Sequence, residues 1–266
     1  MNGRRVDMHT HSSHSFDGNH SCFMLCDSAI SMGAEALAIT DHCDIDGKDL
    51  DIDAFCRAQI SEIEECKQRY SGKLDVLAGV EIGQSIYRRE QTVKLLSEYD
   101  YDFVLGSLHN LEDREDFYFL DYSKLDVKGV LNDYFGDLLK VVDFGCFDSL
   151  AHLTYPMRYI SDAGIAVDLA EFSSVIDEIL SLLAEKEKAL EINTSGLFLS
   201  MKSTLPDVSI VKRFKELGGK YITLGSDSHY AQKLYKGIEQ GADVAKSAGF
   251  EYVTVYRNRE PELAKI

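Results

Sequence analysis

Histidine and carboxylate residues form closely spaced pairs near both ends of this 266-residue chain. His9-Thr10-His11 lies near the start, Asp227-Ser228-His229 lies near the end, and each pair follows an apolar run. Alternate residues of a strand project from the same face, so each pair can hold one ion between its side chains. Zinc, manganese and iron all accept imidazole nitrogen and carboxylate oxygen as ligands. We therefore expect the fold to bring the two pairs together around one metal site.

Further candidate ligands lie between these pairs, each at the end of an apolar run that is typical of a strand. They are His42 in Thr40-Asp41-His42, Glu81 in Gly79-Val80-Glu81, His109 in Gly106-Ser107-Leu108-His109, and His152 in Ala151-His152. A single histidine beside a strand is more often a hydrogen-bonded core residue than a ligand. The chain has eight histidines, and six of them lie at the ends of such runs, which favours a shared site instead. His14 and His20 lie in the loop after the first strand, where either interpretation is open.

Composition limits the partners of such a site. The chain has 28 Lys and Arg against 45 Asp and Glu, a net charge of −17, which opposes a nucleic acid lying along the surface. A small phosphate in a metal pocket remains compatible with this charge. The sequence has no secretory leader pattern and no apolar stretch near the length of a membrane span. We therefore expect a cytoplasmic protein that binds neither nucleic acid nor membranes.

The cysteines are scattered along the chain and contain no Cys-x-x-Cys pair. They are Cys22, Cys26, Cys43, Cys56, Cys66 and Cys146. This spacing indicates neither a disulfide framework nor a thiolate zinc cluster, and we expect reduced thiols. Cys22 and Cys26 are four residues apart and are expected to be buried on one face of a helix.

Short apolar runs alternate with longer amphipathic ones along the chain. Strands are predicted to end near 9–11 and to span 36–40, 74–81, 102–108, 147–152, 189–193 and 221–226, with helices near 22–32, 53–70, 92–97, 125–142, 171–187, 208–217 and 233–248. Strands separated by helices pair in parallel through right-handed crossovers. Ligands at both ends of the chain require the sheet to close. We therefore predict a single α/β domain over residues 1–266, a seven-stranded (β/α) barrel similar to a TIM barrel, with the metal site at the C-terminal ends of its strands.

These motifs, in this order, resemble those of the polymerase and histidinol phosphatase (PHP) superfamily of metal-dependent phosphoesterases. The similarity spans nearly the whole chain through residues 7–11, 39–42, 79–81, 105–109, 151–152 and 225–229. Residues 103–109, 189–194 and 217–229 are most similar to the monofunctional histidinol-phosphatase branch. The resemblance implies a distorted (β/α)7 barrel with three divalent ions (zinc, manganese, iron or a mixture). It also implies hydrolysis of L-histidinol phosphate to L-histidinol and phosphate, a step of histidine biosynthesis.

The resemblance also implies a ligand set. The first ion would be held by His9, His11, Glu81 and Asp227, and the second by Glu81, His109 and His152; the third would be held by His42, His229 and one residue of the loop after His11. In family members this loop residue lies eight places after the first histidine of the pair. Here that position is Asp17, which we choose over His14 and His20.

Several cations around a phosphate monoester would neutralise its oxygens and lower the pKa of a bridging water, so that hydroxide attacks phosphorus. Asp227 and His229 are candidate catalytic residues for the leaving-group proton, although the general acid stays unassigned. Arg158 is suited to bind the phosphate through two parallel hydrogen bonds. The alternative interpretation is that Arg158 is an ordinary surface arginine. Some histidinol phosphatases carry a second arginine where this chain has Ser195. The Ser195 hydroxyl, or Lys202 from the following loop, could supply the missing contact.

Two other functions remain open from the sequence. A phosphoesterase of the same superfamily could act on a nucleotide or another small phosphomonoester. A non-catalytic domain stabilised by metals is disfavoured, because the ligand set is full and no further domain is attached. The sequence leaves the metal identity and the oligomeric state undecided.

Overall fold

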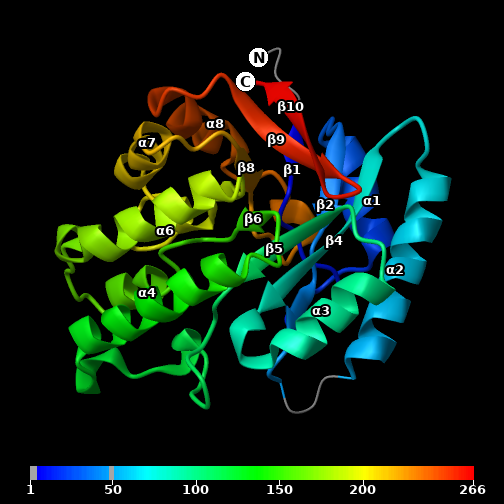
Figure 1. Cartoon of the computed structure of the whole chain (residues 1–266). Coiled ribbons are helices and arrows are strands. Elements are labelled where there is room, and N and C mark those ends of the chain that lie inside the picture. Colours follow the sequence, from blue (N-terminus) through cyan, green and yellow to red (C-terminus); the bar gives the residue numbers. More distant parts are fainter. Residues whose placement is uncertain (1–4, 48–50) are drawn as a thin grey trace.

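The central sheet of this computed structural model, which describes residues 5–47 and 51–266, consists of parallel strands flanked by helices (Figure 1). Seven strands follow the order β1-β2-β4-β5-β6-β7-β8. Their bounds are β1 (Val6–Asp7), β2 (Ala36–Ile39), β4 (Asp75–Gly83), β5 (Phe103–Ser107), β6 (Ser149–Leu150), β7 (Ala189–Asn193) and β8 (Ile222–Gly225). An eighth, β3 (His42–Asp44), pairs with the C-terminal half of β4. The seven ordered strands match the predicted runs.

The first and last of these strands meet and nearly close the sheet into a barrel. Met8 N donates to Leu224 O at 2.9 Å, and Asp227 N donates to His9 O at 2.8 Å. A parallel bridge between Thr10 and Ser228 continues this contact. The predicted α/β barrel of seven parallel strands is therefore confirmed, and its seam lies between the two ligand pairs from opposite ends of the chain.

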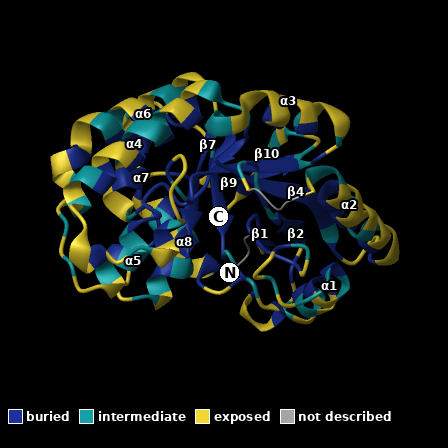
Figure 2. Ribbon diagram, turned by 90° about the horizontal axis from the view of Figure 1, so that it is seen from below, coloured by how far each residue is buried: buried dark blue, intermediate teal, exposed yellow. Residues whose placement is uncertain are grey.

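Amphipathic helices cover the outside of the barrel. They are α1 (Cys22–Ser31), α2 (Ile52–Arg69), α3 (Arg89–Glu98), α4 (Val127–Phe144), α5 (Met157–Asp162), α6 (Ser173–Glu185), α7 (Val208–Glu216) and α8 (Ile238–Ser247). Figure 2 shows buried residues on the strands and on the inner faces of the helices, and exposed residues on the outer faces. Local signals set several helix ends: Asp51 accepts from Ala54 N at 3.0 Å at the start of α2, and Gly145 ends α4 with φ 68°.

A C-terminal β-hairpin, which the sequence analysis did not predict, covers the N-terminal end of the barrel. Its antiparallel strands are β9 (Tyr252–Arg257) and β10 (Glu260–Lys265). At its turn, Asn258 N donates to Asp102 Oδ1 at 3.1 Å, and the Arg259 guanidinium pairs with Asp148. Asp102 and Asp148 immediately precede β5 and β6. The hairpin is therefore fixed to the starts of two barrel strands.

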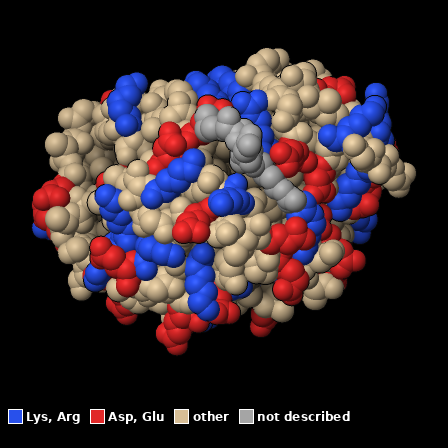
Figure 3. All heavy atoms as spheres, turned by 90° about the horizontal axis from the view of Figure 1, so that it is seen from above, with Lys and Arg blue, Asp and Glu red and all other residues tan. Residues whose placement is uncertain are grey.

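Other differences from the predicted elements are local. The last helix begins at Ile238 rather than near residue 233, because Gly237 has φ 86°, a left-handed conformation that an α-helix cannot include. The short helix α5 and the strand β3 were not predicted. On the face seen from the side of the hairpin, Lys and Arg side chains are interspersed with Asp and Glu (Figure 3). Within residues 5–47 and 51–266, no helix combines the length and the apolar character needed to cross a membrane.

Candidate metal centre

The predicted metal ligands converge at the C-terminal end of the barrel. His9 and His11 follow β1, His42 begins β3, Glu81 lies in β4, His109 follows β5, His152 follows β6, and Asp227 and His229 follow β8. Parallel strands all end at the same side of a barrel, so ligands that are distant in sequence become neighbours. Two of them, His152 (φ 22°) and Asp227 (φ 55°), adopt backbone conformations that are uncommon for residues with a Cβ. Such conformations concentrate at functional sites, where surrounding structure holds them in place.

Glu81 is the buried centre of the cluster. Its Oε2 lies 3.2 Å from His9 Nε2 and 2.9 Å from His42 Nδ1. Its Oε1 lies 3.1 Å from His109 Nε2 and 2.9 Å from His152 Nε2. Burial raises the pKa of Glu81, but the nearby histidines lower it far more, so the pKa lies well below its usual range. The side chain is thus a carboxylate with one oxygen facing each half of the cluster, the arrangement of a bridging ligand.

Asp227 faces the histidine pair across the seam of the barrel. Its Oδ1 lies 3.3 Å from His11 Nε2 and 3.7 Å from His9 Nε2. Although burial raises the pKa of Asp227, the positive charges of Arg158 and His9 hold it well below the usual range. Asp227 therefore presents an ionised oxygen to both imidazoles, and with Glu81 these residues form a compact set of four donors.

Three imidazoles gather at the outer side of the cluster. One ring nitrogen each of His11, His42 and His229 lies within 4.8 Å of the others. His11 Nε2 and His229 Nε2 are buried and form no well-aligned hydrogen bond with any described residue. Burial, together with His229 and His42, lowers the pKa of His11 well below its usual value, which keeps the ring in the neutral form that binds metals. Ring nitrogens that converge in this way fit a cation between them.

The loop after β1 places Asp17 beside this third group of ligands. Asp17 Oδ2 lies 3.0 Å from His229 Nε2, and Asp17 Oδ1 lies 3.8 Å from His42 Nε2. His14 Nε2 instead lies 2.7 Å from Glu62 Oε2. His20 Nδ1 accepts a hydrogen bond from Ala231 N at 3.3 Å. The structure thus brings Asp17, rather than His14 or His20, to the cluster. Metal ligation by Asp17 stays a prediction.

Carboxylates that the sequence analysis missed hold the ligating rings from behind. His9 Nδ1 lies 2.7 Å from Glu191 Oε1, and Glu191 Oε2 accepts from His152 N at 2.7 Å. Asp44 Oδ1 lies 3.0 Å from His109 Nδ1. A partner on the second ring nitrogen fixes the orientation of a ligating histidine and selects its tautomer. One signal was available for Glu191, because a charged residue interrupts the apolar strand β7.

Arg158, on α5, reaches the edge of the cluster. Its side chain is 12% exposed, and its guanidinium pairs with the Asp227 carboxylate. The same guanidinium donates to Ser195 Oγ at 2.7 Å and to Asn193 Oδ1 at 3.3 Å. Arg158 Nε is buried and has no hydrogen-bond partner among the described residues. Among the described residues, this donor is therefore left unsatisfied.

A pocket of about 780 Å³ opens over the cluster and is large enough for a small molecule. Its lining includes Arg158, Ser195 and the aromatic residues Phe16, Tyr118, Phe119, Tyr155, Tyr159, Phe198 and Tyr230. Lys202 is exposed and lies outside the residues that line this pocket, whereas Lys233 and Lys236 line it. These two lysines were not among the predicted site residues. Lys236 lies over the Phe198 ring, with Nζ 3.8 Å from the centroid.

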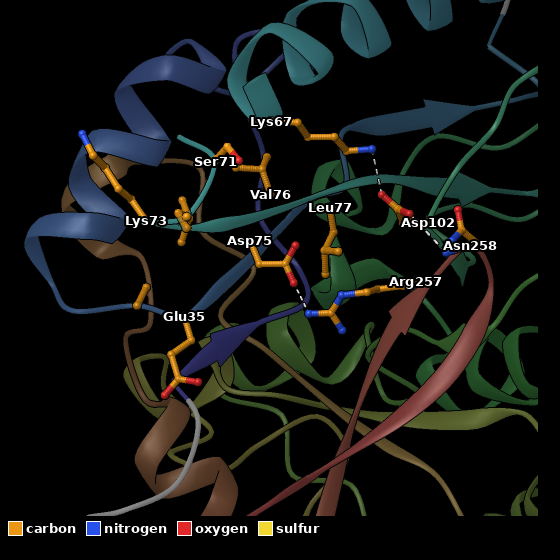
Figure 4. Close-up of a pocket in the computed structure, with 13 residues that line it drawn as sticks. Glu35, Lys67, Ser71, Lys73, Asp75, Val76, Leu77, Asp102, Arg257 and Asn258 are labelled. Atoms are coloured by element: carbon orange, nitrogen blue, oxygen red, sulfur yellow. Dashed lines mark hydrogen bonds and ion pairs between the residues drawn. The ribbon is translucent and has the colours of Figure 1, made fainter. Parts of the chain in front are cut away.

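A second pocket, of about 640 Å³, lies at the opposite end of the barrel, near the hairpin (Figure 4). Two ion pairs lie within it: Lys67 Nζ lies 3.0 Å from Asp102 Oδ2, and Arg257 pairs with Asp75. None of the histidines lines it within the described ranges. The converging donors therefore mark the C-terminal pocket as the candidate site.

Comparisons with known proteins agree with this geometry. The PHP domain family matches residues 7–195. The chain is 30% identical to a histidinol-phosphatase of Lactococcus lactis over 255 residues, which is 95% of this chain and 94% of that protein. It is 31% identical to a probable histidinol-phosphatase of Thermotoga maritima over 255 residues, covering 94% and 95% of the two chains. A crystal structure of the L. lactis histidinol phosphate phosphatase in complex with zinc, L-histidinol and phosphate superimposes with a TM-score of 0.83 at 26% identity, covering 97% of this chain and 99% of that one.

Proposed function

Because the chain belongs to the PHP domain family, we propose that it hydrolyses L-histidinol phosphate to L-histidinol and phosphate. The observation that carries this proposal is the similarity, over nearly the full length of both chains, to histidinol-phosphatases. The structure adds a small-molecule pocket whose floor is the His and carboxylate cluster. These observations support a metal-dependent phosphoesterase, and the similarity favours histidinol as its alcohol.

Three groups of donors would hold three divalent ions of zinc, manganese or iron. The first group is His9, His11, Glu81 and Asp227, the second is Glu81, His109 and His152, and the third is Asp17, His42 and His229. When bound, such ions supply positive charge to the phosphoryl oxygens and make hydroxide available near neutral pH. The buried carboxylate of Glu81, shared by two groups, would keep neighbouring ions close together.

The chain's own residues position the phosphate and manage the leaving group. Arg158 would bind a phosphate oxygen through its free Nε and through donors that now contact Ser195 and Asn193. The Ser195 hydroxyl would donate one further hydrogen bond to the phosphate beside it. We propose that Asp227 and His229 manage the proton of the leaving alcohol indirectly, and the contact of His229 Nδ1 with the backbone O of Asp227 at 3.1 Å orients the His229 ring beside the cluster.

The pocket also suits the alcohol of this substrate, which carries an imidazole and an ammonium group. Tyr155 and Tyr159 pack edge to face, with centroids 5.4 Å apart, and offer ring surfaces on one wall. Asp116 lies on the same wall, where its Oδ1 accepts from Tyr155 OH at 3.3 Å. A carboxylate stabilises an ammonium group, and aromatic rings beside it can stack with an imidazole or contact the cation. We propose that Asp116 contacts the substrate's positive charge.

The proposal is tested by measuring kcat/KM of the zinc- or manganese-loaded protein for L-histidinol phosphate, phosphoserine, p-nitrophenyl phosphate and nucleoside monophosphates. We expect L-histidinol phosphate to be preferred by about a hundredfold or more, since charged contacts to the alcohol add selectivity. Asp116→Asn should remove much of this preference and leave p-nitrophenyl phosphate turnover unchanged. A nucleotide as the best substrate would replace the proposed alcohol, and no turnover of any phosphomonoester would indicate a non-catalytic domain.

A further inference from the structure

A second cluster of metal-binding side chains lies outside the three groups described above. One ring nitrogen of His14, Sγ of Cys22 and one carboxylate oxygen of Glu62 all lie within 4.8 Å of one another. His14 Nε2 lies 2.7 Å from Glu62 Oε2. None of these residues belongs to the proposed phosphatase site, so their convergence needs a separate explanation.

The cluster joins three segments of the fold. His14 lies in the loop after β1, Cys22 is the first residue of α1, and Glu62 lies within α2. Cys22 N donates to Glu62 Oε1 at 3.0 Å, which holds the carboxylate in place beside the thiol. The three donors therefore already share one location, and no segment has to move for them to reach a common ion.

The cluster is partly open to solvent. Cys22 is buried, whereas the side chains of His14 and Glu62 are 19% and 21% exposed. An ion can thus approach past the imidazole and the carboxylate and meet the thiol from outside. Water can occupy the remaining coordination position on the same side.

The charges around the thiol favour a cation. Burial raises the pKa of Cys22, and the negative charges of Asp41 and Glu62 raise it further. Asp41 is buried and accepts hydrogen bonds from Ser12, Ser15 and Gln59. A divalent cation would offset this negative potential and stabilise the thiolate, with release of the thiol proton to solvent.

We propose that His14, Cys22 and Glu62 bind a fourth divalent ion of the zinc type, with water completing a tetrahedral shell. Imidazole nitrogen, thiolate sulfur and carboxylate oxygen are all zinc ligands, whereas magnesium and calcium require oxygen donors. The sequence indicates no thiolate zinc site, because these residues form no closely spaced motif. This proposal goes beyond the proposed phosphatase function and does not rest on it.

Such an ion would fix the loop that carries Asp17. Residues 12–20 lie in the segment between β1 and α1, and the ion would tie this loop to both α1 and α2. The loop is otherwise held by contacts such as Ser12 with Asp41 and Ser13 N with His20 O at 2.8 Å. The fourth ion would therefore have a structural role next to the phosphatase site.

Cobalt is the probe that separates this site from the others, because none of the other proposed ligands is a thiolate. Titration of the metal-free protein with Co²⁺ should produce a thiolate-to-cobalt charge-transfer absorption, and elemental analysis should find one more ion per chain than in Cys22→Ser. Cys22→Ser should lose the absorption. The matched control is Cys26→Ser, which alters a buried cysteine one turn later on α1 and should keep it.

His14→Asn covers the case in which Cys22→Ser does not fold, since the His14 side chain is partly exposed whereas Cys22 is buried. This variant should need at least about tenfold more cobalt to reach the same absorption, as expected for loss of one ligand. Wild-type protein without the absorption at saturating cobalt would overturn the proposal. An absorption of equal intensity in Cys22→Ser, or unchanged cobalt affinity in His14→Asn, would overturn it as well.

Discussion

Replacement of Arg158 by alanine tests the phosphate contact directly. The guanidinium is nearly buried, pairs with Asp227, and donates to Ser195 Oγ at 2.7 Å. Its Nε has no partner among the described residues. A phosphate dianion beside Asp227 would therefore gain two charge-assisted hydrogen bonds from one side chain, and no second arginine stands at Ser195 to replace them.

The magnitude follows from an exchange of hydrogen bonds. Each charge-assisted hydrogen bond contributes about 1.5–3 kcal/mol, so two contribute about 3–6 kcal/mol. Part of this gain is offset, because Arg158 must release its present contacts with Ser195 and Asn193. We therefore expect Arg158→Ala to lower kcat/KM for L-histidinol phosphate by roughly two to three orders of magnitude, about 3–4 kcal/mol. Arg158→Lys keeps the charge without the planar fork and should lose about tenfold.

The assay is steady-state phosphate release by protein of known metal content. Metal content is the essential control, since alanine also leaves the Asp227 carboxylate without its arginine. Ser195→Ala should cost far less than Arg158→Ala, and Lys202→Ala should have no effect because Lys202 is exposed and outside the pocket lining. Unchanged kinetics of Arg158→Ala at normal metal content would refute the reasoning and place the phosphate elsewhere.

Three further predictions concern ligation, positioning and pH. Asp17→Asn should lower metal occupancy and turnover by about 10- to 100-fold, while His14→Asn should leave turnover nearly unchanged. The reverse order of turnover in a steady-state assay would contradict the choice of Asp17. Glu191→Gln should weaken metal binding in a chelator competition by about 10- to 100-fold, because it weakens the contact that orients His9, and an unchanged affinity would argue against this role. Burial raises the pKa of Asp7 from 3.8 to about 6, so the folded state binds this proton more tightly than the unfolded state. The contribution of Asp7 to stability is thus greatest below pH 3.8 and falls as the pH rises through about 6. In urea unfolding, the free energy of unfolding of the wild type should fall by about 3 kcal/mol relative to that of Asp7→Asn across this range. A difference between the two proteins that does not change with pH would contradict this prediction.

The barrel and the convergence of the candidate ligands were predictable, because the apolar runs of the strands end at the candidate ligand residues. Each predicted strand is a short apolar run, and most of these runs end in a histidine or a carboxylate. A ligand pair near each end of the chain then favours a closed sheet over an open one. The hydrogen bond from Asp227 N to His9 O joins the two pairs and closes the sheet at this point.

The hairpin was missed because its turn lacks the usual signal. Residues 252–257 alternate in a way that is typical of a strand, but a two-residue turn is usually recognised by Asn-Gly or Asp-Gly. Here Asn258 (φ 49°) and Arg259 (φ 66°) adopt the left-handed conformation without glycine. The arginine in place of glycine is explained by its tertiary contact, the ion pair with Asp148.

The residues that support the site were harder to predict than its ligands. Glu191 and Asp44 act through the second ring nitrogens of His9 and His109, and these pairings depend on strand neighbours rather than on sequence spacing. Lys202 was chosen for its closeness to Ser195 in sequence, whereas the chain path brings Lys233 and Lys236 to the pocket. Side chains on loops depend on the path of the loop, which local sequence does not determine.

Because the candidate metal centre lies at the seam of the barrel, bound ions would also affect how the barrel unfolds. The contacts between β1 and β8 join residues from opposite ends of the sequence, and closing so long a loop costs conformational entropy. An ion shared by His9, His11 and Asp227 would cross-link the two edges, in the way that a disulfide closes a long loop. Removal of the ions should then open the barrel along this seam before the rest of the sheet unfolds. Amide exchange at Met8 and Asp227, compared with that at the centre of β5, would follow this opening.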